Sequence, residues 1–129
     1  MLILVLRSDK PEAEIGLFDD ERELSYKTWQ AHRKLAETIH QENATNLQFI
    51  DKKLSDIDGI VVYKGPGSFT GLRIGISVAN ALAYGLNIPI VGSAGKNWLN
   101  KGLKQIINGE NELFATAEYG EEALVTPAK

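Results

Sequence analysis

The residues best placed to do chemistry lie in a glycine-rich segment at 65–71. Three glycines fall within its seven residues, and glycine permits backbone angles closed to other residues. Because a helix start carries unpaired N–H groups and partial positive charge, a helix that follows makes this segment a candidate anion site. A tight turn that only caps a buried helix fits equally well, with Ser68 or Thr70 as the cap. The candidate residues are Gly65, Pro66, Gly67, Ser68, Phe69, Thr70 and Gly71.

Known phosphate-binding motifs match this segment poorly. A Walker A loop ends in Gly-Lys-Ser/Thr, whereas Gly71 is followed by leucine and arginine. The dinucleotide motif G-x-G-x-x-G finds its first two glycines at Gly65 and Gly67, but its third position falls on Thr70. The sequence therefore gives little support to a Rossmann dehydrogenase.

The sequence contains no residue pattern typical of other catalytic sites or of metal sites. Ser68 and Ser93 lie outside any G-x-S-x-G elbow, and there is no cysteine to act as nucleophile or metal ligand. The histidines His32 and His40 are eight residues apart near one helix, without a third ligand. We expect no catalytic residue, no metal and no cofactor in this chain.

The elements that position the segment follow from hydrophobic patterning. The first three predicted strands are joined by brief turns, which predicts an antiparallel meander. After them, apolar strand-like runs alternate with segments of helical periodicity. Predicted strands are 2–6, 14–18, 24–29, 60–63 and 88–91; predicted helices are 31–43, 46–54, 70–86 and 93–107. Residues 43–46 interrupt the first two helices, and 113–117 could pair with 123–126 as a hairpin. The order β-β-β-α-β-α-β-α indicates an α/β fold with a mixed sheet.

The helix at 70–86 is unusual because small residues recur along it. One row is Gly71, Gly75, Ala79 and Ala83, and a second is Ser77, Ala81 and Gly85. Small residues at this spacing let another backbone approach closely. Since a sheet can cover only one side of such a helix, we infer that a protein partner covers the other. The alternative is cover from helix 31–43 or from the C-terminal tail.

The predicted interface combines this helix with helix 31–43. Arg73 and Asn80 are candidate polar contacts across it, since buried polar groups need partners. A bulky residue at Gly75 or Ala79 is expected to abolish association and leave the chain folded. The predicted interface residues are Leu35, Ile39, Arg73, Gly75, Ile76, Ser77, Ala79, Asn80, Ala83 and Tyr84.

Length and composition suit one small domain. The chain has 129 residues, 43% of them hydrophobic, and a net charge of −3, which gives no overall electrostatic signal for nucleic acid. Lys96, Lys101 and Lys104 are more typical of a solvated helix face than of a nucleic-acid site. The apolar start lacks the features of a signal peptide, and no stretch approaches the ~20 apolar residues of a membrane span. These features predict a cytoplasmic protein.

A family resemblance appears at the glycine-rich segment. Residues 65–75 read GPGSFTGLRIG, which resembles the signature of the bacterial TsaB (YeaZ) family. Residues 54–59 and 81–89 extend the likeness, which spans roughly 2–107 and is strongest over 54–93.

The resemblance implies a fold and a role. The fold would be a single actin-like (ASKHA) lobe with a five-stranded mixed sheet. The role would be that of a non-catalytic subunit in making threonylcarbamoyladenosine on tRNA, paired through helices including 70–86 with a TsaD-like catalytic subunit. A TsaE-like ATPase would join, a homodimer could form alone, and tRNA would be met only through the complex. The alternative is a nucleotide- or phosphate-binding module using 65–71.

Two departures from the family pattern bear on that role. Members typically end their first strand in Asp-Thr-Ser, whereas Arg7-Ser8-Asp9 aligns here. Arginine cannot ligate a metal, although it could bind an anion directly. Members also carry a second lobe; here we expect an N-terminal lobe at 1–108 and only an acidic hairpin or tail at 109–129.

Overall fold

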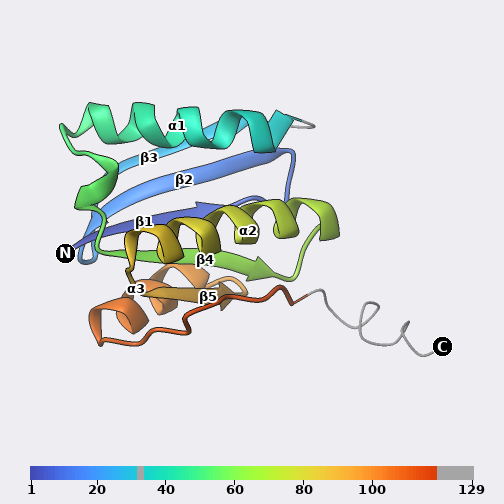
Figure 1. Cartoon of the computed structure of the whole chain (residues 1–129). Helices are drawn as coiled ribbons and strands as arrows, with labels where there is room; N and C mark the ends of the chain where they lie inside the picture. Colours follow the sequence, from blue (N-terminus) through green and yellow to red (C-terminus); the bar gives the residue numbers. More distant parts are fainter. Residues whose placement is uncertain (32–33, 119–129) are drawn as a thin grey trace.

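A computed structural model describes residues 1–31 and 34–118 and shows five strands in one mixed sheet, in the order β3-β2-β1-β4-β5 (Figure 1). The strands are β1 (Leu2–Arg7), β2 (Glu12–Asp19), β3 (Arg22–Gln30), β4 (Gly59–Gly65) and β5 (Ile90–Ala94). The helices are α1 (Leu35–Phe49), the short 3-10 helix η2 (Leu54–Asp56), α2 (Phe69–Leu86) and α3 (Trp98–Ile107). This confirms the predicted element order and α/β class.

The sheet joins an antiparallel half to a parallel half. β1, β2 and β3 form the predicted antiparallel meander, while β4 and β5 run parallel to β1. The carboxyl ends of β1, β4 and β5 therefore lie at the same end of the sheet, together with the starts of α1 and α2 (Figure 1). This arrangement places the segment at 65–71 at the end of β4, between the sheet and α2.

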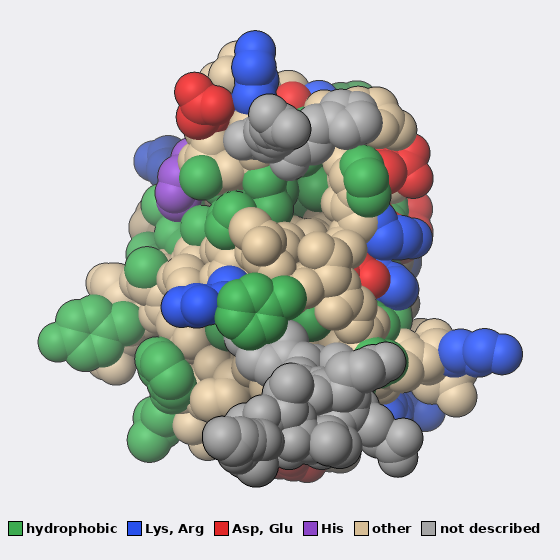
Figure 2. Space-filling view, turned by 90° about the vertical axis from the view of Figure 1, so that its right-hand side faces the viewer, with side chains coloured by type: hydrophobic (Ala, Val, Ile, Leu, Met, Phe, Trp, Pro, Cys, Tyr) green, Lys and Arg blue, Asp and Glu red, His purple; other side chains and the backbone are tan. Residues whose placement is uncertain are grey.

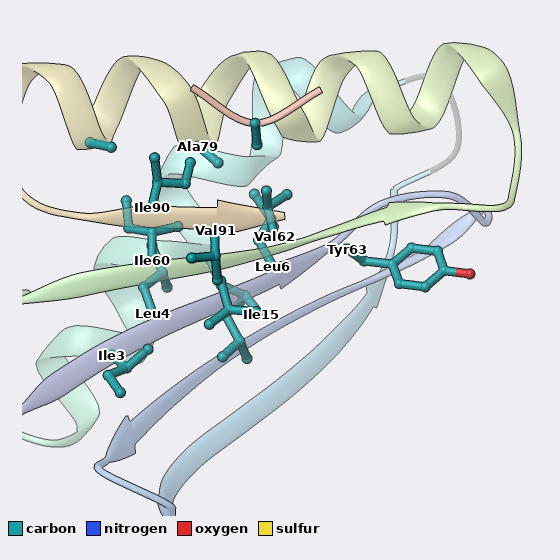
Figure 3. Close-up of a cluster of buried hydrophobic side chains, with 14 of the residues drawn as sticks. Ile3, Leu4, Leu6, Ile15, Ile60, Val62, Tyr63, Ala79, Ile90 and Val91 are labelled. Carbon is teal, nitrogen blue, oxygen red and sulfur yellow. The ribbon is translucent and has the colours of Figure 1, made fainter. Parts of the chain in front are cut away.

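Helices cover both faces of the sheet. On β4, Val61 contacts Gly102 of α3, and the alternate residues Ile60 and Val62 point to the opposite face, on which α2 packs. α1 lies beside α2 and packs on β2 and β3. The core side chains between these layers are almost fully buried, including Ile3, Leu4, Leu6, Ile15, Ile60, Val62, Ile90 and Val91 (Figure 3).

The prediction of two helices within 31–54 is wrong, because α1 runs without interruption through Asn43 and Asn46. Both asparagines face inward and are buried. Asn46 accepts a hydrogen bond from Ser25 Oγ on β3 and donates one to the Ile15 carbonyl on β2 at 3.3 Å. These contacts with the sheet outweigh the tendency of Asn43–Asn46 to break a helix.

The C-terminal part also differs from expectation. α3 starts at Trp98 rather than at 93, because β5 continues through Ala94 and Gly95 then adopts a φ of 83°. Residues 113–117 form no strand. Their predicted hairpin partner, 123–126, lies outside the described residues. Lys96, Lys101 and Lys104 are exposed, as predicted.

Candidate functional site

The glycine-rich junction connects β4 directly to α2. Gly65 has a φ of 130°, and a Cβ there would collide with the backbone oxygen of Glu118. The peptide bond between Gly65 and Pro66 is cis. Tyr63 donates a hydrogen bond from its hydroxyl to the Pro66 carbonyl at 2.7 Å. Ser68 occupies the N-cap position of α2, but its side chain makes no capping hydrogen bond.

The first small-residue row holds α2 against the chain's own β1. Ser8, just after β1, donates a hydrogen bond to the Gly71 carbonyl at 2.7 Å. A Cβ on Gly71 would collide with the Ser8 backbone oxygen, and one on Gly75 with the Ser8 hydroxyl. Ala79 is fully buried. Bulk at Gly75 or Ala79 would therefore disrupt folding, so the expectation that such variants stay folded does not suit this structure.

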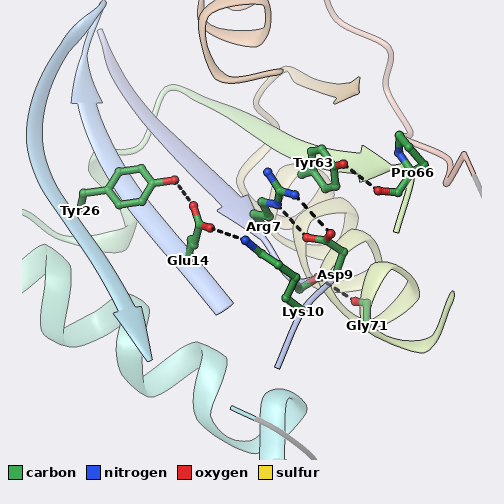
Figure 4. Close-up of polar contacts among 9 residues, drawn as sticks. Arg7, Asp9, Lys10, Glu14, Tyr26, Tyr63, Pro66 and Gly71 are labelled. Atoms are coloured by element: carbon green, nitrogen blue, oxygen red, sulfur yellow. Dashed lines mark hydrogen bonds and ion pairs between the residues drawn. The ribbon is translucent and has the colours of Figure 1, made fainter. Parts of the chain in front are cut away.

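A polar cluster lies beside the junction at the end of β1 (Figure 4). The Arg7 guanidinium donates hydrogen bonds to both carboxylate oxygens of Asp9, at 2.7 and 3.3 Å, and stacks 3.9 Å from the centre of the Tyr63 ring. Burial alone would lower the pKa of Arg7, but the hydrogen bonds and charge of Asp9 raise it overall. Burial raises the pKa of the Tyr63 hydroxyl. Arg7 is thus a permanent cation whose charge Asp9 balances.

A second part of this cluster joins β2 to β3. The Tyr26 hydroxyl donates to a Glu14 carboxylate oxygen at 2.6 Å, and the Lys10 ammonium lies 3.6 Å from the other oxygen. The Tyr26 ring covers Gly16 and meets Phe18 edge-on at 6.3 Å. Burial, followed by the hydrogen bond to Glu14, raises the pKa of Tyr26.

We expect Tyr26→Phe to flatten the loss of stability at alkaline pH. The raised pKa of folded Tyr26 means that its contribution is fully present below the unfolded pKa of about 10 and is lost as pH rises further. At pH 7 the variant should lose only about 1 kcal/mol, for one hydrogen bond. Urea denaturation of both proteins at pH 7 and at pH 10.5 measures this. If the free energy of unfolding fell by the same amount between pH 7 and pH 10.5 in both proteins, this prediction would be contradicted.

A hollow of about 480 Å³ opens between the starts of α1 and α2. It is lined by Ser8, Asp9, Lys10, Pro11, Ala31, Leu35, Ser68, Thr70, Gly71 and Ile74. Figure 2 views this end of the molecule, from which hydrophobic side chains project beside lysine and arginine side chains. The structure therefore brings two of the candidate hydroxyls and the α2 start to a surface hollow. The described residues contain no group of histidines and acids that could hold a metal ion.

The predicted interface residues divide into buried and exposed sets. Six lie within the chain's own core: Leu35, Ile39, Gly75, Ile76, Ala79 and Ala83. Arg73, Ser77 and Tyr84 are exposed on α2, together with Ala81 and Gly85 of the second small-residue row. Arg73 stacks 5.2 Å from the centre of the Phe69 ring. The surface offered by α2 is thus the second row and not the first.

Asn80 contacts the chain's own C-terminal segment. Its amide nitrogen donates to the Ala115 carbonyl at 3.0 Å, and its amide oxygen accepts from the Ala115 N–H at 2.8 Å. Glu112 donates its N–H to Ile90 at the outer edge of β5. The C-terminal segment thus covers one flank of α2, as the alternative to a protein partner had allowed. The described residues leave the second small-residue row of α2 uncovered.

A row on α1 that sequence reasoning missed lies beside the exposed row of α2. Ala36, His40, Ala44 and Gln48 recur every fourth residue and are exposed. The apolar residues of α1 drew attention to its buried side, whereas the exposed row mixes small and polar types. Two hollows lie between α1 and α2, of about 480 Å³ beside Arg73 and about 290 Å³ beside Leu82. We call these two rows and hollows the α1–α2 face. His32 lies outside the described residues.

Comparison with known proteins shows relatives named for the synthesis of threonylcarbamoyladenosine on tRNA. Residues 29–94, about half of the chain, match the family described as TsaD, tRNA N6-adenosine threonylcarbamoyltransferase. An enzyme of that name from Geotalea daltonii is 52% identical over 62 residues, which cover 48% of this chain and 18% of the enzyme. The tRNA threonylcarbamoyladenosine biosynthesis protein TsaB of Buchnera aphidicola is 38% identical over 74 residues, covering 53% of this chain and 35% of TsaB.

A solved structure extends the likeness to the fold. YeaZ from Pseudomonas aeruginosa aligns with a TM-score of 0.66 and 28% sequence identity, over 72% of this chain and 43% of YeaZ. Its actin-like architecture agrees with the mixed sheet found here. The chain spans less than half the length of each of these relatives.

Proposed function

Since the chain belongs to the tRNA N6-adenosine threonylcarbamoyltransferase family, with TsaB (YeaZ) proteins among its relatives, we propose that it acts in making threonylcarbamoyladenosine on tRNA. It serves there as a non-catalytic subunit that binds a TsaD-like catalytic subunit. Residues 1–108 act as one actin-like lobe, working in the cytoplasm. A TsaE-like ATPase joins the complex, and tRNA is met only through it.

The observation that carries the proposal is the outer surface of α2. Ser77, Ala81 and Gly85 form an exposed row of small residues, and Ile74, Val78 and Leu82 beside them are only half-buried. Small side chains let a partner helix approach closely, and half-buried apolar side chains gain from being covered. The neighbouring row on α1 widens this surface to two helices.

The end of β1 supports a non-catalytic role. In active members that the sequence resembles, the strand-end acid helps to hold metal and nucleotide phosphate. Here Arg7 takes that position, and its guanidinium is paired with Asp9 and stacked on Tyr63. A guanidinium cannot ligate a metal, and both carboxylate oxygens of Asp9 are already bound by Arg7, so this position does not suit metal-assisted phosphate chemistry.

Co-purification with the TsaD-like protein of the same organism tests the proposal. We expect a defined complex by sedimentation, and faster threonylcarbamoyl transfer to tRNA by the TsaD-like protein when the chain is added. A chain that sediments alone beside that protein and leaves the transfer rate unchanged would overturn the proposal.

A nucleotide- or phosphate-binding module is the second candidate, favoured by the hollow that Lys10, Ser68 and Thr70 line. Isothermal titration of the isolated chain with ATP, ADP and AMP separates the two candidates. Tight binding would favour the module, whereas heats no larger than dilution are expected for the subunit.

A further inference from the structure

Resting on the proposed function, we propose that Lys64, Lys101 and Lys104 bind phosphate groups of the tRNA backbone. These three lysines border one hollow beside β5, the edge strand of the sheet. Contacts of this kind hold and orient a nucleic acid without reading its base sequence, so the site positions tRNA on the assembled complex.

The fold brings the three lysines together from separate elements. The hollow has a volume of about 550 Å³ and is bordered by Lys64 of β4 and by Lys101 and Lys104 of α3. The last two are three positions apart on α3, so they lie on one face of the helix, and both are exposed. The sequence indicated only a solvated helix face, because Lys64 is far from the other two along the chain.

The positive charge at this hollow is not balanced by ion pairs. The three lysines form no ion pair with any described residue. Glu112 and Glu118 also border the hollow, but Glu112 accepts the Gly92 N–H at 2.9 Å. Three lysines and two glutamates leave one excess positive charge here, although the whole chain carries −3. Because like charges held together repel, a bound anion stabilises this arrangement.

The shape and chemistry of the hollow favour a phosphate backbone over a free nucleotide. A lysine ammonium is a compact point charge on a flexible stem, which suits phosphate oxygens presented at varied angles. None of the described residues lining the hollow is aromatic, so the hollow offers no surface on which a base could stack. The anion is therefore recognised by its phosphates alone.

The hollow also stays accessible in the proposed complex. α3 packs on the face of the sheet opposite α2 (Figure 1), so a TsaD-like subunit on the α1–α2 face leaves Lys101 and Lys104 uncovered. Three phosphate contacts give only weak binding by themselves. The lysines thus add to the hold of the TsaD-like subunit on tRNA, and the chain alone binds tRNA poorly.

The test measures the affinity of the complex of this chain with the TsaD-like protein for tRNA, by fluorescence anisotropy over a range of salt concentrations. We expect Lys101→Gln combined with Lys104→Gln to weaken binding about tenfold or more at low salt. The slope of log affinity against log salt should become shallower by about 2, one for each lost phosphate contact. If the double variant fails to fold, Lys104→Gln alone should change the slope by about 1.

Two further variants control for general charge effects. Lys96→Gln removes an exposed lysine close to α3 that does not border the hollow, and it should keep the wild-type slope. Glu118→Gln removes a negative charge that does border the hollow, and it should tighten tRNA binding. Titration of the isolated chain with inorganic phosphate should give heats no larger than dilution. Tight binding of inorganic phosphate would overturn the assignment to the tRNA backbone.

Sedimentation before tRNA is added separates this inference from the proposed function. If the complex forms but the double variant keeps wild-type affinity and slope, the inference is wrong and the proposed function stands. An equal loss in Lys96→Gln would likewise overturn the inference alone. A chain that forms no complex with the TsaD-like protein would overturn both.

Discussion

Replacing Gly71 with alanine is expected to destabilise the chain by about 3 kcal/mol, the upper range for overpacking a close contact. A Cβ at this position meets the backbone oxygen of Ser8, which cannot rotate away as a side chain can. The same change strains the hydrogen bond from Ser8 Oγ to the Gly71 carbonyl. Such a loss is a large fraction of the roughly 5–15 kcal/mol that stabilises a typical domain. Urea denaturation followed by circular dichroism measures it.

Gly85→Ala is the matched control, since it lies on the same helix and the added methyl group would meet nothing within 4 Å. There alanine should stabilise the chain by about 0.5–1 kcal/mol through reduced backbone entropy of the unfolded state. If both variants changed stability alike, the close approach of α2 to β1 would not be what requires glycine at Gly71.

Replacing Ser77 with tryptophan is expected to weaken binding to the TsaD-like protein at least ~100-fold, about 2.7 kcal/mol. Ser77 is exposed at the start of the second small-residue row, so the indole would stand between α2 and a docked partner without disturbing the core. Sedimentation of the mixed proteins and titration calorimetry measure the loss. Thermal unfolding checks that the variant remains folded.

Asn100→Trp provides the comparison on the opposite side of the sheet, since Asn100 is exposed on α3. It should bind the TsaD-like protein with wild-type affinity. Unchanged affinity in Ser77→Trp would remove α2 from the interface and count against the proposed function.

Much of the fold followed from local patterns in the sequence. Apolar runs such as the one in β1 and alternation in β3 predicted the meander and the α/β order, because burial on one or both faces dictates them. The error at Asn43–Asn46 has a tertiary cause. Local propensity marks these residues as helix breakers, but contact of Asn46 with Ser25 and Ile15 becomes visible only once β2 and β3 lie beneath α1.

The site was harder to predict than the fold. The spacing of small residues correctly indicated that another backbone approaches α2 closely. It could not show whether that backbone belongs to a partner protein or to β1 of the same chain. Gly75 illustrates this, because the group that excludes a side chain there is Ser8, 67 residues earlier in the sequence. Asn80 is similar, since its partner Ala115 lies in a segment without regular structure.

The hydrogen bond between Ser8 and Gly71 has a thermodynamic consequence. It ties the first turn of α2 to β1, and the same stiff helix carries Ser77 on its outer row. Residues of α2 line both the junction hollow and the α1–α2 face, so a ligand at the first would affect partner binding at the second only by moving this helix. Such an effect is reciprocal. If a ligand in the junction hollow changed the affinity of the chain for its partner by some factor, the partner would change the affinity for that ligand by the same factor.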